Sequence, residues 1–386
     1  MSRFLAWFVI LGVVAEASLL ADDKKEAGPS DRTALDWPTF RGNPLQTGVA
    51  ESVLPVAESV LPDKLAIRWK FKAKDSVEGS AAIVNGTVFL GSMDGNLYAL
   101  DLASGQKKWA YKAGPIKGGP SVHGDHVFVG DADGIFHCVD AATGNKRWTF
   151  DAGAEVTSGG NFAGETVLFG SYDENLHCLS KEGKELWKVN VPGGPVLASP
   201  VVASGRTFCS GCDSTLHIID TKTGKEQGAV QLDGQTGASA AVVGDDLYIG
   251  TMSNQMLAID LKKQAIKWKY EAEENPQPFF SSPAVTAVVV VVGCRDKRVH
   301  AFNRLTGKHA WEYATKGKVD SSPVIARNRV YVGSSDGNLY VLDLAKGTVV
   351  QKIDLGGPIT ASAAVADNCL VIGTQNGVVY CLGKED

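Results

Sequence analysis

The fold is decided by the stretch Val88-Phe-Leu-Gly91-Ser-Met-Asp94-Gly95-Asn-Leu-Tyr-Ala-Leu-Asp101, because it returns closely as Val330-Tyr-Val-Gly333-Ser-Ser-Asp336-Gly337-Asn-Leu-Tyr-Val-Leu-Asp343. Five further copies lie between the two and one follows the second, so that the eight copies are 39, 40, 40, 40, 43, 40 and 40 residues apart. One position therefore recurs in eight units, at Gly91, Gly130, Gly170, Ser210, Gly250, Gly293, Gly333 and Gly373. A period of this length indicates repeats that stack on one another.

Each unit has the pattern of short β-strands, because apolar and polar residues alternate and β-branched and aromatic types are frequent. Asp94-Gly95 and Asp336-Gly337 are typical hairpin turns, since both residue types tolerate positive φ. Ten residues before each aligned position stands a small residue or a proline, preceded by Ser or Gly, which suits an innermost strand crowded around one axis. The tryptophans late in five units are expected to wedge into the neighbouring unit: Trp109, Trp148, Trp187, Trp268 and Trp311.

The two ends of the repeat region indicate a closed ring. The last unit stops at Gly383 without a Trp-bearing fourth strand, whereas the strand-like stretch Leu65–Phe71 precedes the first unit. A unit of this size cannot bury its own faces, and radial stacking leaves only short, protected edges. We therefore predict an all-β fold, an eight-bladed β-propeller of four-stranded blades over residues 65–383, in which the N-terminal strand completes the last blade. An open β-solenoid is the alternative.

The N-terminus predicts export from the cytoplasm. Met1-Ser-Arg3 is a short basic start, Phe4 to Val14 is apolar and small residues follow as far as Ala21, so residues 1–21 have the pattern of a cleavable signal peptide. The apolar run is too short for a transmembrane helix, which needs about 20 residues. No cysteine near the cleavage site offers a lipid anchor. Residues 22–64 are expected to form a linker and leader segment, and the expected location is the periplasm or the extracellular medium.

Charge and motifs exclude several classes of function. The chain has 38 Lys and Arg against 43 Asp and Glu, a net charge of −5, and no basic block interleaved with aromatic residues. Nucleic acid is therefore not an expected partner. No Ser/His/Asp set, phosphate-binding glycine loop or paired-carboxylate motif can be assembled from the sequence. We predict no catalytic residues, and a monomer whose mature chain has no transmembrane segment.

One repeat carries a resemblance to a known family. Ala99-Leu-Asp101-Leu-Ala-Ser-Gly105-Gln-Lys-Lys-Trp109 resembles the A-x-D-x-x-[ST]-G-x-x-x-W signature of quinoprotein-type, or PQQ-like, propeller repeats. Val139–Trp148 and Ala301–Trp311 are similar, and the resemblance covers about residues 65–383. The segment Asp36-Trp37-Pro-Thr-Phe40-Arg41-Gly42 is similar to the leader found before many exported propellers of this type.

The resemblance implies one of two functions. Quinoprotein dehydrogenases oxidise alcohols or sugars with PQQ and calcium, and they carry long insertions and in many cases a vicinal disulfide. The nearly uniform 40-residue spacing leaves little room for insertions, and no two cysteines are adjacent. The non-catalytic branch includes BamB-like propellers and implies a scaffold that binds envelope or secreted proteins or peptides. We expect this scaffold, without a cofactor; the alternative is a PQQ- and calcium-dependent dehydrogenase or a degenerate PQQ- or sugar-binding propeller.

Two groups of residues are candidates for binding. The loops that enter the innermost strands would line one mouth of the channel, and they carry Glu78, Lys117, Glu155, Gln235, Asp320 and Thr360. The 43-residue interval is the one longer spacing, and it falls on a loop whose aromatic residues and prolines would anchor a partner: Glu274, Pro278, Phe279 and Phe280. The alternatives are solvated loop residues at the mouth and a phenylalanine that packs between blades.

Cysteines carry a weaker signal. Cys209 and Cys212 have the spacing of a disulfide or a redox dithiol, but Cys209 also falls on a position that is apolar in other units. A single pair of this kind is a weak zinc signal. Cys138, Cys178 and Cys381 share a register that is expected to be buried.

Four histidines also share one register: His137, His177, His217 and His300. A ring of metal ligands is one interpretation. Because equivalent positions on separate blades are held apart, we instead predict that these side chains pack between blades and that the protein has no metal site.

Overall fold

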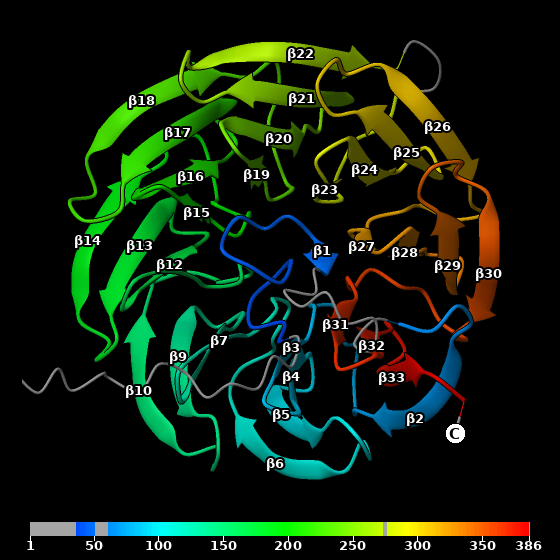
Figure 1. Ribbon diagram of the computed structural model, residues 1–386. Helices are drawn as coiled ribbons and strands as arrows, with labels where there is room; N and C mark the ends of the chain where they lie inside the picture. Colours follow the sequence, from blue (N-terminus) through cyan, green and yellow to red (C-terminus); the bar gives the residue numbers. More distant parts are fainter. Residues whose placement is uncertain (1–35, 51–60, 273–275, 386) are drawn as a thin grey trace, which may run out of the picture. The chain divides into compact units, whose positions relative to one another are not determined.

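The computed structural model describes residues 36–50, 61–272 and 276–385. Every described residue belongs to one compact unit, which lies within Ala34–Asp386. The predicted signal peptide and Glu274 lie outside the described residues. Within the described residues, 33 strands form eight sheets arranged as a ring (Figure 1), which confirms the predicted eight-bladed β-propeller.

Blades 1 to 4 each contain four antiparallel strands, which follow one another from the innermost to the outermost. Blade 1 is β3 (Ala82–Val84), β4 (Thr87–Ser92), β5 (Asn96–Asp101) and β6 (Lys107–Lys112). Blade 2 is β7 (Ser121–His123), β8 (His126–Gly130), β9 (Ile135–Asp140) and β10 (Lys146–Asp151). Blade 3 is β11 (Asn161–Ala163), β12 (Thr166–Gly170), β13 (Asn175–Ser180) and β14 (Glu185–Asn190). Blade 4 is β15 (Val201–Ala203), β16 (Arg206–Ser210), β17 (Thr215–Asp220) and β18 (Glu226–Gln231).

Blades 5 to 8 repeat this plan and add two strands from the N-terminal part of the chain. Blade 5 is β19 (Ala241–Val243), β20 (Asp246–Gly250), β21 (Gln255–Asp260) and β22 (Ala265–Glu271). Blade 6 is β23 (Ala284–Val285), β24 (Val289–Cys294), β25 (Arg298–Asn303) and β26 (His309–Ala314). Blade 7 is β27 (Val324–Ala326), β28 (Arg329–Gly333), β29 (Asn338–Asp343) and β30 (Val349–Asp354), with β1 (Val49–Ala50) added. Blade 8 is β31 (Ala364–Ala366), β32 (Cys369–Gly373), β33 (Val378–Gly383) and β2 (Ala66–Lys72).

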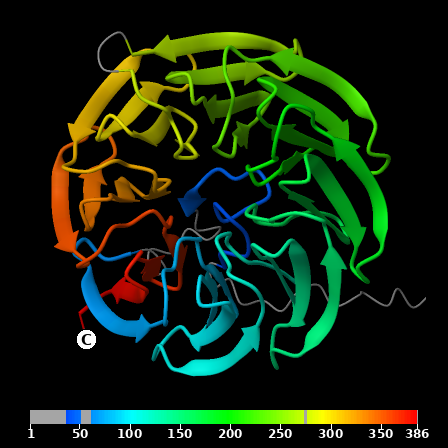
Figure 2. The ribbon, with the colours of Figure 1, turned by 180° about the vertical axis from the view of Figure 1, so that it is seen from behind.

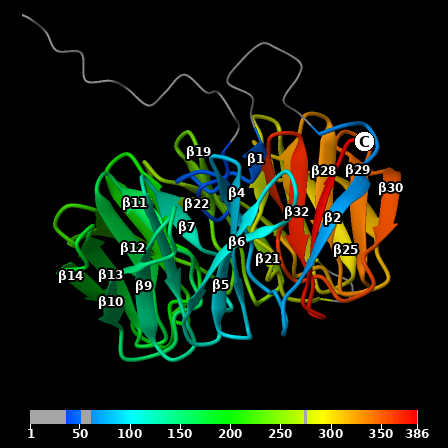
Figure 3. The same ribbon diagram turned by 90° about the horizontal axis from the view of Figure 1, so that it is seen from below.

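The burial of the strands explains their sequences. The two middle strands of a blade are covered on both faces by the neighbouring blades, so β24 is buried along its whole length, Val289 to Cys294. The outermost strand β10 alternates between exposed and half-buried side chains, as expected for a strand that faces solvent on one side. The core therefore lies between the blades, and Figure 3 shows the strands running from one face of the ring to the other.

The ring closes as predicted. The strand β2 pairs antiparallel with β33 of the last blade, with Trp69 opposite Cys381 and Phe71 opposite Val379. The outermost strand of blade 8 thus comes from the N-terminal side of the ring, and its other strands come from the C-terminal end. The additional pairing of β1 with β27, parallel and two residues long, was not predicted.

The segment of residues 36–50, which we call the leader, crosses the centre of the ring, where Figures 1 and 2 both show it in dark blue. It contacts the innermost strands of seven blades in turn. Its main chain pairs with Ile83 of blade 1 and accepts hydrogen bonds from the side chain of Asn161 in blade 3 and from five backbone amides: Val122, Val202, Val242, Val285 and Ile325. Four of its side chains are buried: Trp37, Thr39, Arg41 and Gln46.

The tryptophans join neighbouring blades, as the sequence predicts. In each of the six tryptophans on outermost strands, the indole Nε1 donates a hydrogen bond of 2.7–3.1 Å to a backbone carbonyl of the next blade: Trp69 to Leu102, Trp109 to Ala141, Trp148 to Lys181, Trp187 to Thr221, Trp268 to Arg304 and Trp311 to Leu344. At Gly144, where φ is +74°, an added Cβ would lie 2.7 Å from the Trp109 ring, so the turn needs a glycine there. Gln351 takes the place of tryptophan at the junction with blade 8 and exchanges two hydrogen bonds with the backbone of Leu65.

No helix long and apolar enough to cross a membrane occurs in the part of the chain that the structure describes.

Candidate functional site

A pocket at one mouth of the channel collects most of the predicted mouth residues. We call it the cup; its volume is about 180 Å³. Glu78, Lys117, Asp320 and Thr360 line it, although they come from four different blades. Glu155 contacts Lys117 at the edge of the cup, whereas Gln235 is exposed and does not line the cup.

Serine hydroxyls form an inner ring in the wall of the cup. We call this set the serine belt: Ser80, Ser199, Ser239, Ser282, Ser322 and Ser362. The hydroxyls of five of them accept a hydrogen bond from the backbone N–H of the preceding blade, and the sixth, Ser80, donates to the Ser362 carbonyl. The belt thus links blades around the channel and fixes the diameter of the cup. The repeated Ser or Gly is visible in the sequence, but there it indicates only a requirement for small size.

The leader closes the inner end of the cup. Its backbone partners Ile83, Val202 and Ile325 each follow a belt residue by three positions along an innermost strand, so the leader lies deeper in the channel than the serine belt. Phe40 is the leader residue that lines the cup, and it packs against Gly159. The cup is therefore a blind depression and not the entrance to an open pore.

Ion pairs hold the charged side chains of the cup. Lys117 Nζ lies 2.6 Å from Glu155 Oε1, and this hydrogen-bonded contact raises the pKa of Lys117. Arg295 reaches both carboxylate oxygens of Asp320, at 2.8 and 3.0 Å. The Arg295 guanidinium also lies 3.8 Å above the ring of Phe280, a cation–π contact that orients both side chains. The cup is polar; Asp320 and, at the edge, Glu155 have cationic partners, whereas Glu78 accepts a hydrogen bond from the Ser76 hydroxyl.

The loop of the 43-residue interval differs from the prediction. Phe279 is fully buried and packs against the imidazole of His300 at 5.9 Å between ring centroids, so the prediction that it anchors a partner is wrong. Phe279 takes the register position of Val156 and covers Gly250 of blade 5, as Val156 covers Gly130 of blade 2, so it belongs to the repeated packing between neighbouring blades. Phe280 lines the cup, and the carbonyl of Pro278 accepts a hydrogen bond from the Arg295 backbone.

The cysteines are all free thiols in the described structure, including Cys209 and Cys212. The suggested disulfide between these two residues is therefore absent from it. Cys209 lies on β16 with 2 % of its surface exposed, and burial raises the pKa of its thiol to about 12. This environment suits a small apolar side chain and disfavours a reactive thiolate. Cys138, Cys178 and Cys381 are buried, as expected.

The four aligned histidines stay on separate blades, and each pairs with an aspartate of its own blade. The contacts run from Nε2 to a carboxylate oxygen at 2.7–3.1 Å: His137 with Asp131, His177 with Asp173, His217 with Asp213 and His300 with Asp296. No ring of ligands forms from this register.

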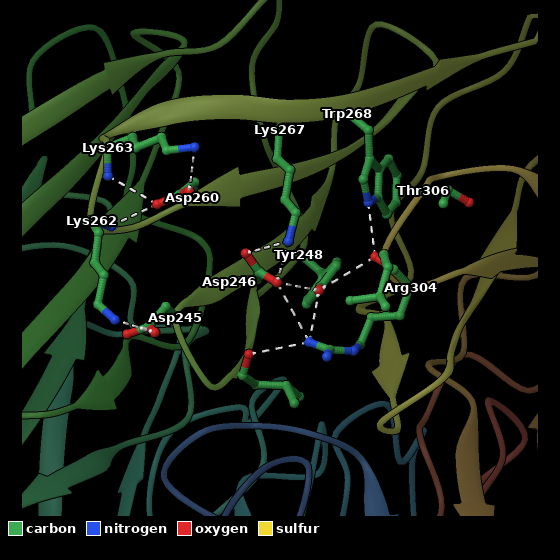
Figure 4. A network of polar contacts seen from close by, with 12 residues as sticks. Asp245, Asp246, Tyr248, Asp260, Lys262, Lys263, Lys267, Trp268, Arg304 and Thr306 are labelled. Carbon is green, nitrogen blue, oxygen red and sulfur yellow. Dashed lines mark hydrogen bonds and ion pairs between the residues drawn. The ribbon is translucent and has the colours of Figure 1, made fainter.

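A second polar cluster lies at the junction of blades 5 and 6 (Figure 4). Asp246 accepts hydrogen bonds from Lys267 at 2.8 and 3.0 Å and from Tyr248 at 3.2 Å, and Arg304 of blade 6 lies 3.5 Å away. Burial, and then the charge of Asp246, raise the pKa of Tyr248 to about 12. The Arg304 carbonyl accepts the indole hydrogen bond of Trp268. The cluster therefore reinforces a blade junction.

Similarity to known proteins identifies the family of this chain. The family described as outer membrane protein assembly factor BamB matches residues 63–157, 132–276 and 213–384, which together span the ring. The chain belongs to this BamB family of PQQ-like repeat propellers. It is 26 % identical over 129 residues to BamB of Nitrosomonas eutropha, an alignment that covers 33 % of this chain and 31 % of that protein. The curated relatives are matched over about a third of their own length or less.

Solved structures of both functional branches share the fold. The structure of BamB from Moraxella catarrhalis superposes with a TM-score of 0.72 at 20 % identity, covering 83 % of this chain and 100 % of that one. Quinohemoprotein alcohol dehydrogenase from Comamonas testosteroni superposes with a TM-score of 0.76 at 14 % identity, covering 91 % and 81 %. Identities at this level establish the fold alone, so the site of this BamB-family propeller has to separate the branches.

The cup does not fit PQQ and calcium. Pockets for ligands of drug size have volumes of about 300–1,000 Å³, whereas the cup measures about 180 Å³. Calcium takes about six to eight oxygen ligands, mostly carboxylates and carbonyls. Among the described residues, no three His, Cys, Asp or Glu side chains converge at the cup, and Asp320 is engaged by Arg295.

Proposed function

We propose that this BamB-family propeller is an exported scaffold of the cell envelope that binds a protein or peptide by receiving one or two of its side chains in the cup. The size of the cup carries the proposal, because about 180 Å³ suits a side chain better than a planar tricyclic cofactor. Export is supported by the basic and apolar pattern of residues 1–21.

The rigidity of the cup supports binding. The serine belt links the blades, and the Arg295–Asp320 and Lys117–Glu155 pairs hold their side chains in one arrangement. A site that is ordered before its partner arrives loses less conformational entropy on binding. Phe280 and Phe40 offer apolar surface beside these polar groups, which is the combination found at binding hot spots.

A calorimetric titration with PQQ tests the proposal against the dehydrogenase alternative. The mature protein is loaded with calcium and titrated with PQQ, and we expect no heat beyond dilution. Stoichiometric binding contradicts the proposal and directs attention to an alcohol and sugar dehydrogenase screen with an artificial electron acceptor. Thr157→Trp, which fills the cup, is the matched variant, because binding elsewhere on the surface would survive it.

Fractionation of cells that produce the full chain tests its location. We expect the protein in the periplasmic or culture fraction, shortened by the predicted signal peptide. A full-length protein in the cytoplasm contradicts the export part of the proposal.

A further inference from the structure

A cluster on blade 6, separate from the cup, brings two imidazoles and a carboxylate together. His300 lies on β25, and His309 and Glu312 lie on the adjacent strand β26. One ligand atom of each residue lies within 4.8 Å of those of the other two. Glu312 Oε2 is 3.8 Å from His300 Nδ1 and 3.8 Å from His309 Nε2. Two nitrogens and one oxygen thus face the same small volume.

Both nitrogens are buried without a hydrogen bond. His300 is 1 % exposed, and neither its Nδ1 nor the Nε2 of His309 has a hydrogen-bond partner among the described residues. The distance of 3.8 Å to Glu312 is too long for a hydrogen bond. Buried polar atoms are satisfied in the great majority of cases, so two exceptions that face one point indicate a missing ligand.

The other blades show that the exception is specific to blade 6. His177 Nδ1 in blade 3 lies 3.4 Å from Glu185, and His217 Nδ1 in blade 4 lies 2.8 Å from Glu226. In the strand register, Glu185 and Glu226 lie opposite Leu179 and Ile219, which are two residues after the histidine of each blade. His309 lies at the same register position in blade 6, opposite Phe302. Blade 6 has therefore replaced a hydrogen-bonding carboxylate by a second imidazole.

Asp296 fixes the orientation of His300. His300 Nε2 lies 2.8 Å from Asp296 Oδ2, and an ionised carboxylate only accepts, so Nε2 carries the proton. The lone pair then lies on Nδ1, which faces His309 and Glu312. Histidines that bind metals usually donate their other N–H to a carboxylate, which holds the ring in place.

The opposite side of His300 is already satisfied. Cys294 and Asp296 also lie close to His300, but the Cys294 thiol donates to the carbonyls of Gln277 and Pro278 at 3.4 and 3.5 Å. Asp296 is hydrogen-bonded to the imidazole. On the Nδ1 side, the two nitrogens and Glu312 Oε2 remain available, whereas Glu312 Oε1 pairs with Arg298 at 3.2 Å.

We propose that His300 Nδ1, His309 Nε2 and Glu312 bind one divalent first-row transition-metal ion, with Zn²⁺ as the reference ion. Two histidines and one glutamate form a ligand set that zinc uses in proteins, with a fourth position left for water or another ligand. Bonds of about 2.0–2.2 Å to a tetrahedral ion require small movements of the three side chains. Glu312 is 44 % exposed and gives the ion access from solvent.

Metal titration of matched variants tests the proposal. The mature protein is treated with a chelator, dialysed and titrated with Zn²⁺ by calorimetry, and with Co²⁺ followed by its visible absorption. His309→Gln and Glu312→Gln each remove one ligand. His217→Gln is the control, because it removes an aligned imidazole whose Nδ1 lies 2.8 Å from Glu226. Thermal unfolding without metal shows whether each variant is folded.

The expected result is one equivalent of bound Zn²⁺ and a Co²⁺ spectrum of a four- or five-coordinate site. His309→Gln should bind at least about 100-fold more weakly, since even residues outside the ligand set change affinity about 10–100-fold. His217→Gln should bind like the parent protein. The proposal is overturned if the protein does not bind one equivalent of Zn²⁺, or if His309→Gln binds Zn²⁺ with the same affinity as the parent protein. In that case water, and not a metal ion, would satisfy the two nitrogens. Because Glu312 is partly exposed, Glu312→Gln decides the matter if His309→Gln does not fold.

Discussion

Gly228 lies directly against the side chain of Gln264 in the next blade, and a Cβ added to Gly228 would collide with Gln264 Oε1. At the preceding junction the sizes are reversed, because Trp187 covers Gly224. Gln264 adopts φ +52°, the left-handed conformation that glycine holds in the equivalent turns. The junction of blades 4 and 5 has thus exchanged its large and small partners.

The exchange predicts strong coupling between the two positions. Gly228→Trp alone should lower the free energy of unfolding by about 1–3 kcal/mol, because the new ring overlaps Gln264. Adding Gln264→Gly should restore the stacked arrangement of the other junctions. Chemical denaturation of the two single variants and the double variant measures the coupling, expected at about 0.5–3 kcal/mol in favour of the pair. Additive effects would mean that Gly228 and Gln264 do not share one packing site.

The ring itself could be predicted from the sequence because its constraints are local and repeated. The hairpin turn Asp94-Gly95 and the indole of Trp109 specify how one blade folds and how it packs on the next. The stretch Leu65–Phe71, which resembles an outermost strand, likewise predicted the closure with β33. Because such features recur along the chain, the repeat can be recognised even where a single unit has lost one of them.

The contents of the channel and the blade 6 cluster could not be predicted in the same way. The leader makes contacts that have no period, such as the side chain of Gln46 with Ser199 and Pro200. His309 was missed because alignment compares equivalent positions on different blades, whereas His300 and His309 lie on adjacent strands of one blade. The signal in the sequence was the presence of two histidines, His300 and His309, on the two strands of one hairpin.

The leader should contribute measurably to stability. Trp37 is 2 % exposed, its backbone pairs with Ile83, and its ring packs against Gly42. Trp37→Ala should lower the free energy of unfolding by about 3–5 kcal/mol, the usual loss for a buried aromatic residue. Urea denaturation measures it, with Leu186→Ala, half exposed on β14, as a control expected to change stability by less than about 0.5 kcal/mol. Equal stability of the two variants would show that the leader packs only loosely in the channel.

Acid should weaken the aspartate–histidine pairs. Burial alone would raise the pKa of Asp131, but the hydrogen bond from His137 and those from the backbone amides of Ile135 and Gly114 outweigh it and lower the pKa. A carboxyl group with a lowered pKa in the folded state stabilises the fold above its unfolded pKa, near 4, and loses that contribution as the pH falls through the folded value. Stability should therefore fall below about pH 4.

Asp131→Asn tests the acid effect. The variant should be less stable than the parent protein at pH 7, by about 1–3 kcal/mol, and its stability should depend less on pH below 4. Asp63→Asn, at an exposed position, is the control and should follow the parent protein. Identical acid profiles for Asp131→Asn and the parent protein would contradict the role of this pair.

Site-specific photo-crosslinking tests the central claim, that the cup receives a partner, most directly. A photoreactive residue is placed at Thr360 in the cup or at exposed Asp125 in the turn between β7 and β8, and the full chain is produced in its own cells. We predict a discrete adduct with an envelope or secreted protein from position 360, none from position 125, and loss of the adduct when Thr157→Trp fills the cup. Adducts that form equally from both positions, or that survive Thr157→Trp, would contradict binding at the cup.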